Sequence, residues 1–283
     1  MIADGTRPHQ DGLLELRAAA DPHGRTYLAE RRQRFPLRIT AAMYLDPGDP
    51  GMAYCYVQNP TGGVFAGDRL TERFVVEPGA RLHVTSQSAT KLYRMEGGRA
   101  HQRVVCRVGA GALLERIPDT LIPQAGSCFI QRTEVEVEDG AVFLAAETVA
   151  PGRIAYGERF AYELLELRTE ARHHSRPLCF ETLRLEPGRS FPARRGLLGP
   201  RDYIASMLVV APGEDGERLA HEIDAVMTGL SDARGAAGAL DDGAGATVRI
   251  MADTAPAARR ALRAAWRTAR EQLLGLSLPR ERK

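Results

Sequence analysis

A Gly-Ala dipeptide recurs in the first half of the chain, at Gly79-Ala80, Gly111-Ala112 and Gly140-Ala141. The glycines are 32 and 29 residues apart, and each dipeptide lies between two short apolar segments. Glycine readily adopts the positive φ angle that tight turns between strands require. A nearly constant period of this length is typical of stacked β units, so the sequence predicts a solenoid or layered sheets. A simple meander, whose glycine turns fall at irregular intervals, is the alternative.

The segments on either side of these turns have the composition of β-strands. Residues 73–77, 81–85 and 102–108 are short and rich in β-branched side chains. Residues 131–138 alternate polar and apolar positions over their second half, which is typical of a half-buried strand. We therefore predict a mainly β fold of stacked strands over residues 13–205.

The pattern changes after residue 205 and predicts a small C-terminal α/β layer with two helices over residues 206–278, in the same domain. The expected elements are a strand, a helix, a mobile loop, a strand and a helix capped by Thr254: residues 207–210, 214–230, 231–245, 247–251 and 254 onward. The first helix has an apolar stripe made of Leu219, Ile223, Val226 and Leu230. In the second helix we expect Trp266 to anchor the core. Residues 1–12 are expected to be a disordered tail and residues 279–283 a second tail.

Composition limits the classes of function. The formal net charge is +2 and aromatic residues make up 6% of the chain, which does not favour binding to nucleic acid. The apolar runs are too short to span a membrane, and residues 1–12 lack the pattern of a secretory signal. The cysteines are widely spaced, which fits a reduced compartment: Cys55, Cys106, Cys128 and Cys179. We therefore expect a cytoplasmic protein with no nucleic-acid or membrane partner.

The sharpest local motif is glycine-rich and ends in an acid. Gly62 and Gly67 have the spacing of a phosphate-binding P-loop, but that motif continues with Lys and then Ser or Thr. Here Asp68 and Arg69 follow, and a carboxylate at that position would repel a nucleotide phosphate. The segment therefore predicts a tight turn that places Asp68 at its exit, and no nucleotide site.

Two adjacent histidines, His173 and His174, raise the question of a metal site. Neighbouring side chains on a strand point to opposite faces, so we expect the pair not to bind one ion together. We interpret both as solvated loop residues. The chain also has no spacing typical of a serine hydrolase or a zinc protease, and we predict that it is not an enzyme.

Five short motifs follow one another along the chain: Gly62-Gly63-x-x-x-Gly67-Asp68, Glu77-Pro78-Gly79-Ala80, Ala89-Thr90-Lys91-x-Tyr93-Arg94, Leu114-Glu115-x-x-Pro118, and Gly152-Arg153-x-x-x-Gly157-Glu158-x-Phe160. Their order and spacing resemble those of the urease accessory protein D (UreD) family. Each motif alone is weak, but five in register are specific. The resemblance is clearest over residues 37–187 and extends more weakly through the helix around Trp266.

This resemblance implies a fold of stacked strands with C-terminal helices, and a cytoplasmic, non-enzymatic chaperone for nickel insertion into urease. Members of the family bind the urease apoprotein and the F accessory protein directly, and they reach the GTPase G accessory protein through F. A water-filled tunnel is thought to guide nickel towards the urease active site. No tightly bound cofactor is implied, only the transient passage of Ni²⁺.

Residue by residue, the resemblance suggests one set of acids along a nickel path and a second set with structural or partner-binding roles. The acids are Asp68, Glu115, Glu147 and Glu158. The second set is Gly62, Gly63, Gly67, Thr90, Lys91, Tyr93, Gly152, Arg153 and Gly157. The chain departs from the family pattern in three places: Arg116 stands where Trp is usual, Ala66 replaces a glycine, and the match ends after Arg280.

Carboxylates suit the transit of a hydrated divalent cation, because histidine or thiolate cages would hold the ion too tightly to release it. We hypothesise that some of the four acids face a polar internal channel, with Lys91 or Arg153 as ion-pair partners. The alternative is that the acids form ion pairs that stabilise turns. For the whole protein, the alternative to a maturation scaffold is a β-rich enzyme with a pocket that the sequence does not reveal.

Overall fold

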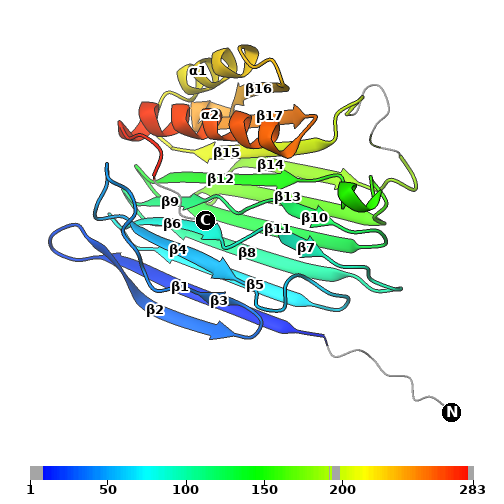
Figure 1. Ribbon diagram of the computed structural model, residues 1–283. Coiled ribbons are helices and arrows are strands. Elements are labelled where there is room, and N and C mark those ends of the chain that lie inside the picture. The colour runs from blue at the N-terminus through cyan, green and yellow to red at the C-terminus, as the bar shows by residue number, and fades with distance from the viewer. Residues whose placement is uncertain (1–8, 191, 193–197, 280–283) are drawn as a thin grey trace.

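The three Gly-Ala dipeptides mark the places where the chain passes from one β-sheet to another. The computed structural model describes residues 9–190, 192 and 198–279. Figure 1 shows two large sheets that lie against each other, with two helices over the last strands of one of them. The predicted mainly β fold with stacked strands and two C-terminal helices is confirmed.

The first sheet has seven strands in the spatial order β14-β13-β11-β8-β5-β1-β2. Neighbours from β1 to β13 run parallel, whereas the outermost strands β2 and β14 pair antiparallel. Its strands are β1 (Asp11–Ala20), β2 (Thr26–Arg34), β5 (Arg69–Val76), β8 (Ala100–Val108), β11 (Cys128–Val137), β13 (Leu164–His173) and β14 (Arg176–Leu185).

The second sheet has ten strands, eight of them in the order β16-β17-β15-β12-β9-β6-β4-β3, with β10 beside β12 and β7 beside β10. Strands β4, β6, β9 and β12 are parallel, and β15 to β17 add an antiparallel edge. The strands are β3 (Arg38–Ile39), β4 (Ala53–Gln58), β6 (Arg81–Ser86), β7 (Thr90–Leu92), β9 (Leu113–Arg116), β10 (Leu121–Pro123), β12 (Val142–Val149), β15 (Tyr203–Val210), β16 (Ala233–Ala239) and β17 (Gly245–Ala252).

Each Gly-Ala corner joins a strand of the seven-stranded sheet to a strand of the ten-stranded sheet, so the chain coils as a solenoid. The glycines have φ angles between 61° and 71°, in the left-handed region. The amide of Gly79 donates to the carbonyl of Ala110, and that of Gly111 donates to the carbonyl of Asp139, both at 3.0 Å. These bonds stack one corner on the next. The alanine that follows each glycine is buried and begins the apolar interior.

Strand alternation directs one set of side chains between the two sheets and the other set outwards. Phe74 and Cys106 of the seven-stranded sheet share the core between the sheets with Leu114 and Phe143 of the ten-stranded sheet. The opposite face of the ten-stranded sheet forms a second core under the helices, which includes Leu144. The ten-stranded sheet is therefore covered on both faces.

The helices are α1 (Gly216–Thr228) and α2 (Ala255–Leu274), and short 3-10 turns are η1 (Ile154–Tyr156) and η2 (Asp241–Gly243). The Thr254 hydroxyl accepts the amide of Ala257, as the predicted helix cap requires. Trp266 is buried and confirms the predicted core anchor. Val226 is partly exposed and Met227 takes its expected place in the core, so one position of the predicted stripe was wrong.

Residues 231–245 do not form the predicted loop, because most of them belong to strand β16 and turn η2. The prediction failed because strands usually carry large side chains that pack on their faces, so a segment rich in glycine and alanine resembles a loop. Here small residues are required: a Cβ on Gly235 would lie 2.9 Å from the Met227 sulfur on α1. The close approach of helix and strand therefore explains the composition.

The ends of the described chain differ from the predicted tails in one respect. Strand β1 begins at Asp11, inside the stretch expected to be disordered, and pairs with β5. Residues 1–8 and 280–283 lie outside the described residues. Within the described part of the chain, neither helix combines the length and apolar character that crossing a bilayer demands.

We predict that Gly111→Ala lowers the free energy of unfolding by about 1–2 kcal/mol, because a Cβ disfavours the left-handed conformation at this corner. The cause would be backbone strain, since no atom lies within 4 Å of the added carbon. Urea unfolding measures the change. Gly238→Ala is the matched control, because Gly238 also has open space but no positive φ; equal losses in both variants would contradict the corner argument.

Candidate functional site

A cavity of about 100 Å³ lies between the two sheets, at the end of the strands away from the Gly-Ala corners. Its inner wall contains five polar side chains: Glu72, Gln102 and Gln131 from the seven-stranded sheet, and Arg116 and Glu147 from the ten-stranded sheet. Its outer wall contains residues of the loops 59–63 and 86–90, including the exposed Gln87 and Ser88. The cavity therefore joins a buried polar cluster to the protein surface.

Arg116 lies at the centre of this cluster, between two carboxylates. Its guanidinium donates to Glu147 Oε1 at 2.9 Å and to Glu72 Oε2 at 3.3 Å. Although burial favours the neutral form, the carboxylates of Glu72 and Glu147 raise the pKa of Arg116 above its ordinary value. Arg116 is therefore a permanent positive charge in the interior.

The two glutamine amides complete the cluster. Gln102 Nε2 donates to Glu72 Oε1 at 2.8 Å, and Gln131 Nε2 donates to Glu147 Oε1 at 2.7 Å. Each carboxylate thus accepts from one amide and from Arg116, which offsets much of the desolvation that burial imposes. Two carboxylates and one guanidinium give the cluster a formal charge of −1 (−2 + 1).

By its net charge, such a cluster would favour a cation over an anion. A hydrated divalent ion that enters from the loops meets a net negative wall of oxygen ligands. Because Arg116 already occupies both carboxylates, an ion has to compete with the guanidinium for them. The arrangement favours weak and reversible contact over tight coordination.

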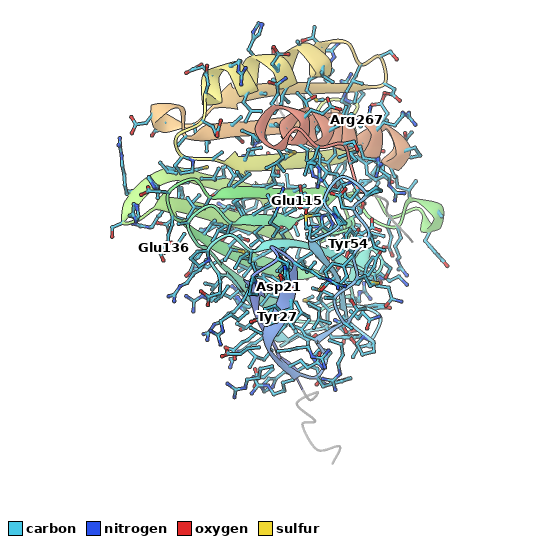
Figure 2. The ribbon with its side chains drawn as sticks, turned by 90° about the vertical axis from the view of Figure 1, so that its left-hand side faces the viewer. Asp21, Tyr27, Tyr54, Glu115, Glu136 and Arg267 are labelled. Carbon is cyan, nitrogen blue, oxygen red and sulfur yellow. The ribbon has the colours of Figure 1, made fainter. Side chains whose placement is uncertain are left out.

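Glu115 does not line the cavity, although Arg116 is its neighbour. Adjacent residues of β9 point to opposite faces, so Glu115 projects towards α2. In Figure 2 Glu115 lies below the helices, near Tyr54 of the same sheet, whereas Glu136 lies on the opposite side of the molecule. The Glu115 side chain is completely buried.

Glu115 belongs to a second charge cluster, built around Arg270 of α2. The Arg270 guanidinium contacts both Glu115 oxygens, at 2.7 and 2.8 Å, and it also pairs with the buried Asp46. His83 Nδ1 lies 2.8 Å from Glu115 Oε2. Burial opposes the charge of Glu115, but the His83 hydrogen bond and the Arg270 charge outweigh it and lower the pKa of Glu115. These contacts hold α2 against the ten-stranded sheet.

Asp68 lies at the exit of the glycine-rich turn, where the sequence placed it, and stabilises the turn through backbone amides. Its carboxylate accepts the amides of Gln10 at 3.0 Å and Phe65 at 2.9 Å, and it is buried. Gly62 and Gly67 have positive φ angles. Strand β5 begins at Arg69 directly after the turn, whereas a P-loop would continue into a helix.

Gly63 and the Thr90-Lys91-x-Tyr93 motif meet beside the mouth of the cavity. A Cβ on Gly63 would lie 2.4 Å from the Lys91 carbonyl and 2.6 Å from the Tyr93 ring, so only glycine fits. Thr90 lines the cavity, and Tyr93 stacks on Phe65 at 4.6 Å between ring centroids. Lys91 is exposed and, over the described ranges, forms no salt bridge; of Lys91 and Arg153, the two cations named as possible partners of the acids, Arg153 forms the ion pair.

Glu158 pairs with Arg153, as one of the two sequence hypotheses expected. Arg153 Nε donates to Glu158 Oε2 at 2.9 Å, and this hydrogen bond is the main reason why the pKa of Glu158 is lowered. Gly157 ends η1 in a left-handed conformation, and a Cβ on Gly152 would lie 2.8 Å from the Glu158 carbonyl. The motif therefore forms a closed turn.

The structure thus places the four predicted acids in four separate surroundings, and only Glu147 lines the cavity. The residues that sequence reasoning missed are Glu72, Gln102, Gln131 and, as a site residue, Arg116. A signal for Glu72 was present, because it interrupts the apolar inward positions Leu70 and Phe74 of β5. Its partners, Gln102 and Arg116, come from the next turn of the solenoid, and no local sequence pattern shows which residues of different turns will meet.

The expectation that His173 and His174 point apart was wrong. Their Nε2 atoms lie 2.8 and 3.2 Å from the same oxygen, Oδ1 of Asp139. Strand β13 ends at His173, and His174 has a positive φ of 49° in the following turn. Strand alternation no longer applies at that point, so the two rings turn to the same side.

Comparison with known proteins assigns the chain to a family. The model of a family described as UreD urease accessory protein matches residues 10–283. The chain belongs to the UreD family. A urease accessory protein UreD from Mycolicibacterium gilvum is 39% identical over 265 residues, covering 94% of this chain and 96% of the relative.

Other UreD relatives come from distant organisms. A UreD 2 protein of Streptomyces griseus is 39% identical over 291 residues, covering all of this chain and 96% of the relative. A UreD protein of Haloarcula marismortui is 36% identical over 276 residues, covering 98% and 91%. The predicted resemblance is thus confirmed over nearly the whole chain, and UreD membership supports a urease accessory role.

We predict that Glu115→Gln lowers the free energy of unfolding by about 3–5 kcal/mol, because it leaves Arg270 buried with one carboxylate fewer. Glu134→Gln is the matched control. Glu134 also pairs with an arginine, Arg103, but both side chains are about half exposed, so the expected loss is below about 1 kcal/mol. Chemical unfolding of both variants measures the difference; equal losses would contradict the role of the Arg270 cluster.

The effect of Glu115→Gln should depend on pH. Because folding lowers the pKa of Glu115 from 4.5, its stabilisation is complete above that value and is lost as the pH falls through the folded pKa. The stability gap between the wild type and the variant should therefore be widest near pH 7 and shrink in acid. Urea midpoints between pH 7 and pH 3 test this, and a gap that widens in acid would contradict it.

Proposed function

We propose that this protein is a cytoplasmic, non-catalytic scaffold in urease maturation, and that the cavity around Arg116 is part of the route by which nickel reaches urease. In this proposal the chain binds the urease apoprotein and the F accessory protein directly, and the GTPase G accessory protein through F. Membership of the UreD family supports the accessory role. The observation that carries the nickel route is the buried cluster of negative charge that opens onto surface loops.

The chemistry of the cluster suits a cargo ion. Ni²⁺ travels hydrated and needs ligands that replace some of its water but release it again. Glu147 and Glu72 supply carboxylate oxygens, and Arg116 prevents both from closing on the ion together. Ni²⁺ passes here as a transient cargo, and the proposal requires no tightly bound cofactor.

The proposal assigns different roles to the predicted acids. Glu147 contacts the nickel path, together with Glu72, which the sequence did not suggest. Glu115 and Glu158 pair with arginines and Asp68 accepts backbone amides, all away from the cavity, and these positions favour structural roles. Thr90 and the Gly63 turn shape the entrance.

We predict that Glu147→Gln reduces urease activation several-fold, because the amide loses the charge that attracts the ion while keeping the shape of the side chain. Glu147→Asp keeps a carboxylate and should restore much of the activity. The measurement is urease activity and nickel content in cells that co-express the urease subunits, the F and G proteins and each variant. Glu134→Gln on the outer surface serves as the control.

Interpretation of this assay requires that assembly be followed separately. Co-purification of each variant with urease and the accessory proteins should be unchanged, because Glu147 lies inside the protein. Normal activation by Glu147→Gln, with unchanged protein level, would exclude the cavity from the nickel route. Loss of co-purification would instead point to a structural effect of the substitution.

A further inference from the structure

The His173-His174 turn lies at the Gly-Ala corner end of the solenoid, away from the cavity. His174 follows the last residue of β13, and Asp139 precedes the Gly140 corner between β11 and β12. The amide of Gly111 donates to the Asp139 carbonyl at 3.0 Å, which fixes the backbone beneath the side chain. The three side chains come from two loops that only the stacking of coil turns brings together.

We propose that Asp139, His173 and His174 form a surface binding site for a divalent transition-metal ion such as Ni²⁺ or Zn²⁺. Their donor atoms all lie within 4.8 Å of one another. Two imidazoles and one carboxylate are ligands that these ions prefer. This inference is independent of the cavity and of the role in urease maturation.

The distances suit one shared ion. Donor atoms bound at about 2.1 Å and at angles of about 90–110° lie about 3.0–3.4 Å apart. Asp139 Oδ1 lies 3.2 Å from His174 Nε2, within this range, and 2.8 Å from His173 Nε2, a distance that would have to lengthen slightly around an ion. The rings are 4.5 Å apart between centroids, so small rotations of the exposed His174 side chain bring all three donors around one ion.

No nearby arginine among the described residues pairs with Asp139, so its carboxylate is available to bind a metal ion. The nearby arginines pair with other acids: Arg172 with Glu170, Arg176 with Asp242. Over the described part of the chain, the side chain of Asp139 has the two histidines as its ionic partners.

The site would bind an exchangeable ion. The Asp139 side chain is 80% exposed and that of His174 is 61% exposed. Three protein ligands leave the remaining coordination positions to water or to a donor from another molecule. The ion would therefore be readily accessible from solvent, unlike an ion in the buried cluster around Arg116.

The test is a calorimetric titration of the full chain, without an affinity tag and freed of metal, with NiCl₂ and separately with ZnCl₂. The wild type should show one site that His173→Ala and His174→Ala each weaken by about tenfold or more, since even outer-shell partners of a metal contribute about 10–100-fold. Asp139→Asn should weaken it as well. Electron paramagnetic resonance of the Cu²⁺-loaded chain should show two nitrogen ligands in the wild type and fewer in His173→Ala and in His174→Ala.

The matched control removes two other exposed histidines, with His23→Ala and His221→Ala combined. This variant should keep the wild-type affinity, because neither histidine belongs to the proposed site. Circular dichroism checks that each variant is folded. Equal affinity in the wild type and a His173→Ala/His174→Ala variant would overturn the proposal, as would equal loss in the control.

Discussion

The stacking of parallel strands fixes where every other part of this protein can lie. Each turn of the coil begins one strand spacing above the last, and the corner glycines hold consecutive turns in register through hydrogen bonds between backbone groups. Register in turn decides which side chains face the space between the sheets. A shift by one residue would exchange the inner and outer faces, and with them the cavity and the helix contact.

Two charge clusters depend directly on this register, and they are built in the same way. Arg116 lies between Glu72 and Glu147 inside the sandwich, and Arg270 lies between Glu115 and Asp46 under α2. Adjacent residues of β9 belong to opposite clusters because strand neighbours point to opposite faces. Buried ion pairs of this kind contribute little net stability but strongly penalise arrangements that leave one charge alone. They therefore specify one alignment of the sheets and of α2.

The two clusters differ in what surrounds them, and this difference separates structure from the proposed function. Around Arg270 the side chains of Trp266 and His83 close the space, and the charges are completely buried. Around Arg116 the glutamine amides and the loop residues leave a cavity that reaches the surface. The same chemistry therefore holds a helix against the sheet in one place and lines an open polar cavity in the other.

Local patterns in the sequence determined the type of fold. The Gly-Ala period marked the corners because glycine alone adopts their conformation without strain, and strand and helix periodicity followed from burial on one face. The family motifs identified the UreD family and marked the turns around Gly63, Asp68 and Gly152. The glycine-rich strand β16 was missed because its residues are small to leave room for α1. That helix packs against the strand in space, which no local pattern shows.

Only the tertiary structure decided which charges meet. Glu72, Arg116 and Glu147 come from three different coil turns, and Glu115 finds its partner 155 residues away. His173 and His174 meet Asp139 because the chain leaves its strand between them. Electrostatic and hydrogen-bonded contacts depend on distances of a few ångströms between groups remote in sequence, and a periodic pattern fixes the face of a residue but not its partner.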